Sequence, residues 1–103
     1  MAARKKKPKT KVPAKHRLKL RLYVAGNAPN SVRAIENLKV FCAHQLFDGH
    51  ELEIVDLLKH PLRALEDGII VTPTLLKVSP LPAQRVIGDL SDSPQVLSTL
   101  RRS

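Results

Sequence analysis

The stretch LKLRLYVAGNAPNSVRAIENLKVFCAHQLF, residues 18–47, decides the fold because its hydrophobic period changes once along its length. Apolar side chains first recur at every second position, which is typical of a β-strand with one buried face. These residues are Leu18, Leu20, Leu22 and Val24. Gly26 and Asn27 end this strand, and Pro29 suits the first turn of a helix. The sequence therefore predicts a strand that leads directly into a helix.

The predicted helix continues to about Asp48-Gly49, where glycine favours its end. Its apolar residues recur at steps of three and four, as on one face of an amphipathic helix. They are Val32, Ile35, Leu38, Cys42 and Leu46. A second strand is predicted over residues 52–57. A strand, a helix and a strand form a βαβ unit, so we expect the two strands to be parallel with a right-handed crossover.

The remaining sequence predicts a short helix, a hairpin and a last helix. Pro61 can begin the short helix and Gly68 can end it. Apolar strands over 74–78 and 85–88 are separated by a short proline-rich turn, which favours an antiparallel hairpin. Asp92-Ser93-Pro94 suits the start of a helix with one apolar face, formed by Val96, Leu97 and Leu100. The order βαβαββα is that of an α/β, thioredoxin-like domain.

The net charge of +9 is unevenly distributed along the chain. Residues 1–17 contain eight of the 18 basic residues and no acid, so residues 18–103 have a net charge of only +1. We expect residues 1–17 to be a disordered basic arm before a single domain over 18–103. This arm is compatible with a solubilising tail, or with a sequence-independent contact to nucleic acid or another acidic partner.

A thiol enzyme is not indicated. The reactive Cys-x-x-Cys pair of thioredoxin-like enzymes lies between the first strand and the first helix, and here residues 26–31 contain no cysteine. The single cysteine, Cys42, is expected to be buried and inert on the apolar face of the helix. The histidines lack metal-ligand spacing, so we expect no metal. They are His16, His44, His50 and His60. No glycine-rich phosphate loop and no recognisable pair of catalytic acids occur, so we expect no cofactor and no catalysis.

A membrane location is not indicated either. No apolar run approaches the roughly 20 residues that span a bilayer. No segment of signal-peptide type follows the basic start before Leu18. We therefore expect a soluble, cytoplasmic protein.

Three motifs in order resemble the KaiB family of circadian-clock proteins. They are LYVAGNAPNSVRA at 22–34, IVDLLKHP at 54–61, and VTPTLLKV at 71–78 followed by RVIGDLS at 85–91. This resemblance implies a non-catalytic regulator that binds a KaiC-type hexameric ATPase and autokinase, with KaiA-type proteins or histidine kinases as further partners. The alternative is a nucleic-acid-binding or stress-response adaptor on the same fold, acting through the basic arm.

The resemblance also suggests particular residues. Arg33 and Arg85 match basic positions of the family, and Lys59 and Asp67 are further candidate contacts. Glu36 departs from the pattern, because clock members often have lysine there. In thioredoxin-like domains a cis-proline precedes the third strand, so a cis Thr72–Pro73 bond is predicted.

KaiB proteins are metamorphic: one state is a tetramer with its own fold, and the other is a thioredoxin-like monomer that binds KaiC. This chain has Thr99 and Arg101 where typical clock members have glycine and aspartate, and no acidic tail follows Ser103. Replacing a helical glycine gains at most roughly 1 kcal/mol, and a cation in the last turn about 0.3–1 kcal/mol. Pro94 suits a first helical turn and opposes a strand interior. We therefore expect mainly the thioredoxin-like monomer.

Overall fold

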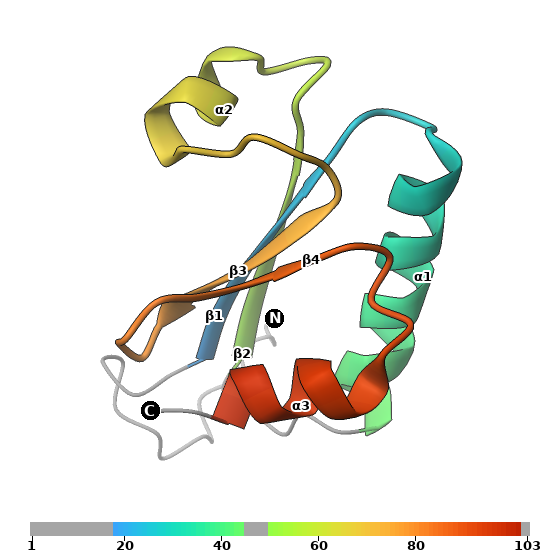
Figure 1. Ribbon diagram of the computed structural model, residues 1–103, viewed down its shortest axis with the longest axis vertical. Helices are drawn as coiled ribbons and strands as arrows, with labels where there is room; N and C mark the ends of the chain where they lie inside the picture. Colours follow the sequence, from blue (N-terminus) through green and yellow to red (C-terminus); the bar gives the residue numbers. More distant parts are fainter. Residues whose placement is uncertain (1–17, 45–49, 102–103) are drawn as a thin grey trace, which may run out of the picture.

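The computed structural model describes residues 18–44 and 50–101. They form one mixed sheet with helices on both of its faces (Figure 1). The elements are β1 (Leu18–Val24), α1 (Pro29–His44), β2 (His50–Asp56), α2 (Leu62–Asp67), β3 (Thr74–Ser79), β4 (Gln84–Ile87) and α3 (Ser93–Arg101). This order confirms the predicted thioredoxin-like fold. The basic arm predicted for residues 1–17 lies outside the described residues.

The four strands lie in the order β2-β1-β3-β4. β1 pairs in parallel with β2, as the βαβ unit predicts, and antiparallel with β3. β3 and β4 form the predicted antiparallel hairpin. β1 is therefore a central strand, and side chains on both of its faces can be buried.

The larger part of the core lies between the sheet and the helices α1 and α3. Its buried members are Leu20, Leu22, Val24, Ala34, Leu38, Phe41, Leu75, Val86, Leu90, Val96 and Leu100. The sequence therefore predicted correctly which residues of β1 and α3 face the core. Helix and sheet bury complementary apolar stripes here, which is the main source of stability in a domain of this size.

The predicted apolar face of α1 is wrong at Val32, whose side chain is 36% exposed. Leu38 is buried as predicted, but Ser31 and Ala34, which were not predicted for this face, are buried in place of Val32. The Ser31 hydroxyl accepts a hydrogen bond of 3.0 Å from the Ala25 N–H, which turns this side of the first helical turn inward. The small Ala34 then lies in the core beside the sheet. Leu46, predicted for the same face, lies outside the described residues.

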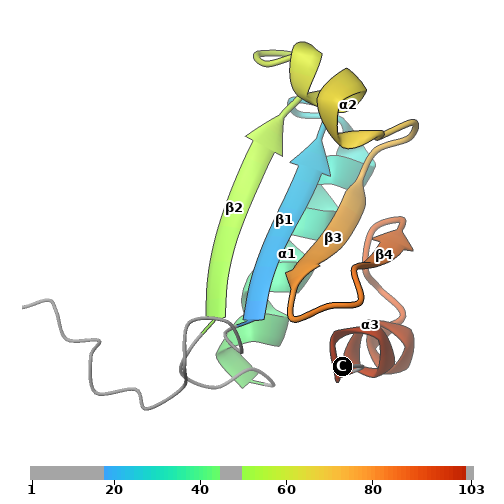
Figure 2. The same cartoon turned by 90° about the vertical axis from the view of Figure 1, so that its left-hand side faces the viewer.

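The opposite face of the sheet carries a smaller apolar cluster beneath α2. Tyr23, Val55 and Ile69 are buried there, with Ala64 and Leu76 packed against them. Figure 2 shows α2 beyond the ends of β1 and β2, on the side of the sheet away from α1. As predicted, α2 follows Pro61 and ends at Gly68, which adopts the left-handed conformation with φ 68°.

Three X–Pro peptide bonds are cis among the described residues: Thr72–Pro73, Ser79–Pro80 and Leu81–Pro82. The first is the bond for which the sequence predicts a cis-proline, directly before β3. In the part of the chain that the structure describes, no helix has the length and apolar character needed to cross a bilayer.

Candidate docking surface

Large apolar side chains are exposed on α2 and on the loops beside it. They are Leu58, Leu62, Leu65, Ile70 and Val71, and together we call them the docking surface. Leu65 is 81% exposed and Ile70 is 94% exposed. All five belong to α2 or its flanking loops, at one end of the molecule (Figure 1). Exposed apolar side chains gathered in one region are a candidate surface for a partner.

The short length of α2 explains why its leucines face outward. The helix contains no buried residue. Ala64 packs against the small cluster, while Arg63 and Asp67 direct their charged groups toward the sheet. In a helix of two turns the other face is then left for Leu62 and Leu65.

Two of the predicted contact residues meet at the C-terminal end of α2. Arg85, from β4, donates hydrogen bonds to the carbonyl oxygens of Gly68 at 2.9 Å and Asp67 at 3.2 Å. A guanidinium group beside the last carbonyls of a helix is favourable because these carry partial negative charge. Arg85 remains an exposed residue beside the docking surface. Lys59 is also exposed, in the loop between β2 and α2.

Asp67 does not project into solvent as a surface contact would. Its carboxylate accepts a hydrogen bond of 2.6 Å from the Tyr23 hydroxyl and one of 3.4 Å from Arg63 Nε. The Tyr23 hydrogen bond is the main reason that the pKa of Asp67 lies below its usual value, against the opposing effect of desolvation. The side chain of Asp67 therefore serves contacts within the molecule.

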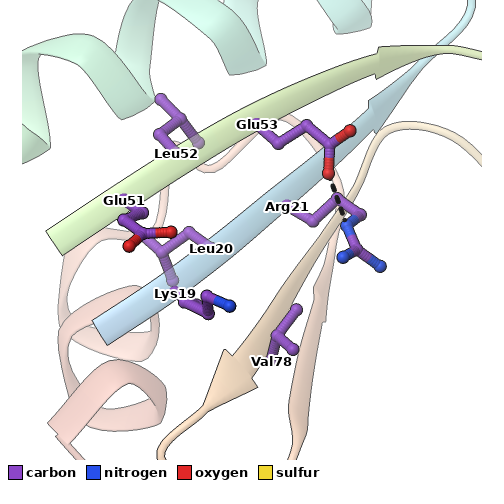
Figure 3. Close-up of a pocket in the computed structure, with 7 residues that line it drawn as sticks. All are labelled: Lys19, Leu20, Arg21, Glu51, Leu52, Glu53 and Val78. Atoms are coloured by element: carbon purple, nitrogen blue, oxygen red, sulfur yellow. Dashed lines mark hydrogen bonds and ion pairs between the residues drawn. The ribbon is translucent and has the colours of Figure 1, made fainter. Parts of the chain in front are cut away.

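These contacts extend across the face of the sheet. We call Arg21, Tyr23, Glu53, Arg63 and Asp67 the charge network. Arg21 donates to Glu53 at 2.9 Å and to the Tyr23 hydroxyl at 3.2 Å, and Arg63 approaches Glu53 at 3.4 Å. Figure 3 shows Arg21 and Glu53 side by side on neighbouring strands. Of these five residues, only Asp67 was a candidate from the sequence. The charges of Arg21 and Glu53, on the face of β1 and β2 opposite the core leucines, were the sequence signal that could have indicated the charge network.

A shallow pocket of about 170 Å³ lies next to the Arg21–Glu53 pair (Figure 3). Lys19, Arg21, Glu51 and Glu53 contribute charged groups to its lining. The two cations and two acids balance each other, so the pocket has no excess of positive or negative charge that would attract an ionic ligand.

The remaining predicted contact, Arg33, belongs to another part of the molecule. It lies on α1, and its Nε donates to Asp89 Oδ2 at 3.3 Å, while its guanidinium also pairs with Asn30. Asn37 donates to the Asp89 carbonyl at 2.8 Å. Hydrogen bonds from Ser91, followed by the one from Arg33, lower the pKa of Asp89. These contacts join α1 to the segment between β4 and α3.

The loop that would hold a reactive cysteine pair is instead fixed by polar contacts. Asp56 Oδ1 accepts hydrogen bonds from the N–H groups of Leu58 at 2.9 Å and Gly26 at 3.0 Å, which lower its pKa. Cys42 is half-buried against the core rather than fully buried as expected, and burial raises the pKa of its thiol. Within residues 18–44 and 50–101, no group of three potential metal ligands occurs.

Comparison with known proteins identifies the relatives of this chain. The sequence model of the KaiB domain matches residues 21–102. The chain belongs to the KaiB family. The circadian clock oscillator protein KaiB of Synechococcus elongatus is 54% identical over 78 residues, 76% of each chain. KaiB of Trichodesmium erythraeum is 48% identical over 85 residues, 82% of each chain. These KaiB relatives support the role of a clock regulator.

Solved structures confirm the fold. The N-terminal domain of SasA from Synechococcus elongatus has a TM-score of 0.65 at 23% identity, covering 82% of this chain and 80% of that domain. Thioredoxin from Fasciola hepatica has a TM-score of 0.69 at 13% identity, covering 85% of each chain. The region matched by the KaiB model contains the docking surface and the charge network, and it leaves out the basic arm.

Proposed function

We propose that this KaiB-family protein binds a KaiC-type hexameric ATPase through its docking surface and regulates a circadian or related timing system without catalysis. The supporting observation is the set of exposed leucines on α2, inside the region matched by the KaiB model. Apolar side chains as exposed as Leu62 and Leu65 contribute little to the stability of the isolated domain. Their contribution arises when a partner removes them from water.

The docking surface has the composition of a protein interface. Complete burial of one leucine side chain contributes about 1.5–3 kcal/mol, so a few residues such as Leu62 and Leu65 can supply most of an affinity. Lys59 and Arg85 are exposed cations near this surface and would favour acidic groups around an apolar patch on the partner. In this proposal Leu62 and Leu65 provide the central contacts, and the two cations orient the complex.

The absence of a catalytic role is also part of the proposal. Two observations support it: the loop over residues 26–31 has no thiol, and the raised pKa of Cys42 disfavours the thiolate.

A binding measurement with the purified KaiC-type ATPase of the same organism tests the main proposal. Leu65→Asp places a charge in the docking surface, and we expect at least about tenfold weaker binding, or 1.4 kcal/mol. Leu81→Asp is the matched control, because Leu81 is 75% exposed in the turn between β3 and β4. We expect the control to bind as the wild type does. Equal binding by both variants and the wild type, or no binding by the wild type, would overturn the proposal.

Deletion of residues 1–17 separates this proposal from the alternative. KaiC binding should persist without the basic arm, because the docking surface is in the folded domain. Loss of KaiC binding on deletion would contradict docking through the folded domain. If the activity found were instead nucleic-acid binding that deletion abolishes, the adaptor alternative would replace the proposal.

We further propose that the thioredoxin-like monomer is the main state in solution. In the described fold Pro94 is exposed in the first turn of α3, Thr99 is inside that helix, and Arg101 is its last residue. All three positions are compatible with a helix, as the sequence comparison with typical clock members suggests. Analytical ultracentrifugation should give one species with the mass of a monomer. A stable tetramer with a different secondary structure would contradict this.

A further inference from the structure

α2 carries the docking surface, yet little apolar packing fixes its position. None of its residues is buried. Beneath it lie three buried residues, Tyr23, Val55 and Ile69, whereas the opposite face of the sheet buries a much larger cluster. The position of a helix with so little buried surface must depend strongly on its polar contacts.

The charge network supplies these contacts from two strands. Tyr23 and Arg21 on β1 reach Asp67, at 2.6 Å from the tyrosine hydroxyl and 3.6 Å from the guanidinium. Glu53 on β2 reaches Arg63 at 3.4 Å, and Arg63 also contacts Asp67 one helical turn later. From the far side, Arg85 on β4 holds the last carbonyl groups of α2. Both ends of this short helix are thus tied to the sheet.

The geometry points to Tyr23 and Asp67 as positioning residues that hold α2 in the orientation needed for binding, without touching the partner themselves. This inference rests on the proposed function, because it assumes that the docking surface is the binding site. Tyr23 is 0% exposed, so a partner on the outer face of α2 cannot contact it. The carboxylate of Asp67 accepts hydrogen bonds from Tyr23 and Arg63, on the side of α2 that faces the sheet. Loss of either group weakens the attachment of α2 to the sheet while the leucines remain present.

Two measurements distinguish positioning from direct contact. The first is amide hydrogen exchange in the free protein at Gly68 and Ile69, whose N–H groups bond to Leu65 and Ala64 at 3.4 Å and 2.8 Å. These amides exchange when the end of α2 opens. The second is the affinity for the KaiC-type ATPase, measured on the same proteins.

Tyr23→Phe and Asp67→Asn should each make local opening of α2 more frequent, which amide exchange detects. We therefore expect about tenfold faster exchange at these two amides and three- to tenfold weaker binding. Leu65→Ala is the contrasting variant: binding should weaken, but exchange should stay at the wild-type rate. Glu66→Gln changes the same charge one residue away from Asp67, at an exposed side chain, and should leave exchange unchanged. Because both substitutions remove the same hydrogen bond, the double variant Tyr23→Phe/Asp67→Asn should lose clearly less binding free energy than the sum of the two single losses.

Unchanged exchange in both single variants would overturn the inference, and so would faster exchange with wild-type affinity. Additive effects in the double variant would show that Tyr23 does not act through Asp67, which also overturns it. If the wild-type protein failed to bind the ATPase, the proposed function would fall together with the role in docking. Exchange in the free protein would then still decide whether the two residues hold α2.

Discussion

The two faces of the sheet hold their helices by different means. Against one face, α1 and α3 bury a continuous set of leucine, valine and phenylalanine side chains. Against the other, α2 rests on three buried residues and is tied by charged groups of β1, β2 and β4. Exposing buried apolar area costs much free energy, whereas partly exposed ion pairs contribute about 0–1 kcal/mol each. The first face therefore determines the stability of the domain, and the second leaves the element used for binding easier to move.

The largest difference between the faces should appear on truncating leucines. Leu22 is fully buried in the main core, so Leu22→Ala should lower the free energy of unfolding by about 2–5 kcal/mol. Leu62 on α2 is 67% exposed, and Leu62→Ala should change it by less than about 0.5 kcal/mol. Urea unfolding followed by circular dichroism measures both. Similar losses in the two variants would refute the contrast between the faces.

A smaller effect is expected from the hydroxyl of Tyr23. Tyr23→Phe keeps the ring in the small cluster but removes the hydrogen bond to the Asp67 carboxylate. Hydrogen bonds to charged groups contribute about 1.5–3 kcal/mol, and Asp67 retains Arg63, so we expect a loss of about 1–2 kcal/mol. Thermal unfolding of the two proteins in one buffer gives this difference. A variant as stable as the wild type would show that the network does not hold α2.

Acid should weaken the α2 face selectively. The pKa of Asp67 is lowered in the fold, chiefly by the Tyr23 hydrogen bond, so its ionised form stabilises the protein above the unfolded value of about 3.9. That contribution is lost as the pH falls through the lower, folded pKa. The stability difference between wild type and Asp67→Asn should thus be largest near pH 7 and shrink below about pH 4. Urea unfolding from pH 7 to pH 3 tests this, and a constant difference would contradict it.

Glu53 should act in the same direction as Asp67. Desolvation is the largest single influence on its pKa and raises it, but the hydrogen bonds from Arg63 and Arg21 outweigh it, so the pKa is lowered overall. Glu66→Gln serves as the control for this series, because it removes an exposed carboxylate outside the charge network.

The smallest effect should come from the ion pair between α1 and the segment after β4. The side chain of Arg33 is 55% exposed, so its contact with Asp89 is well screened by water. Arg33→Gln should lower the free energy of unfolding by less than about 1 kcal/mol, and less in 1 M salt than in 0.1 M salt. If Arg33→Gln destabilised the protein more than Tyr23→Phe does, the expected ranking of these contacts would be wrong.

The sequence predicted those parts of the fold that depend on the hydrophobic period and on proline and glycine at the ends of helices and strands. The alternation in β1, the start of α2 after Pro61 and its end at Gly68 all follow from local rules. The helix face at Val32 was missed because a serine can be buried when its hydroxyl accepts a backbone hydrogen bond, as Ser31 does. Residue type alone does not reveal such a partner.

The candidate site was predictable only in part, for a similar reason. Arg85 was chosen because it matches a basic position of the family, and Lys59 as a further candidate, and the structure places both as exposed residues near α2. The inward direction of Asp67 depends on Tyr23, which is 44 residues away in sequence, and only the pairing of β1 with its neighbours brings the two together. From the sequence, the leucines of α2 look like the buried face of a short helix. The sequence does not show which side of a two-turn helix packs against the sheet.

Gly26 carries a consequence for protein engineering. It adopts φ 53°, and a Cβ atom placed there would lie 2.8 Å from Cδ1 of Leu58. A designer who wished to install a dithiol in this loop, and so convert the scaffold into an oxidoreductase, would meet two obstacles at this position. A cysteine at residue 26 would be conformationally strained, and the exposed Leu58 side chain would have to move aside to make room for its Cβ atom.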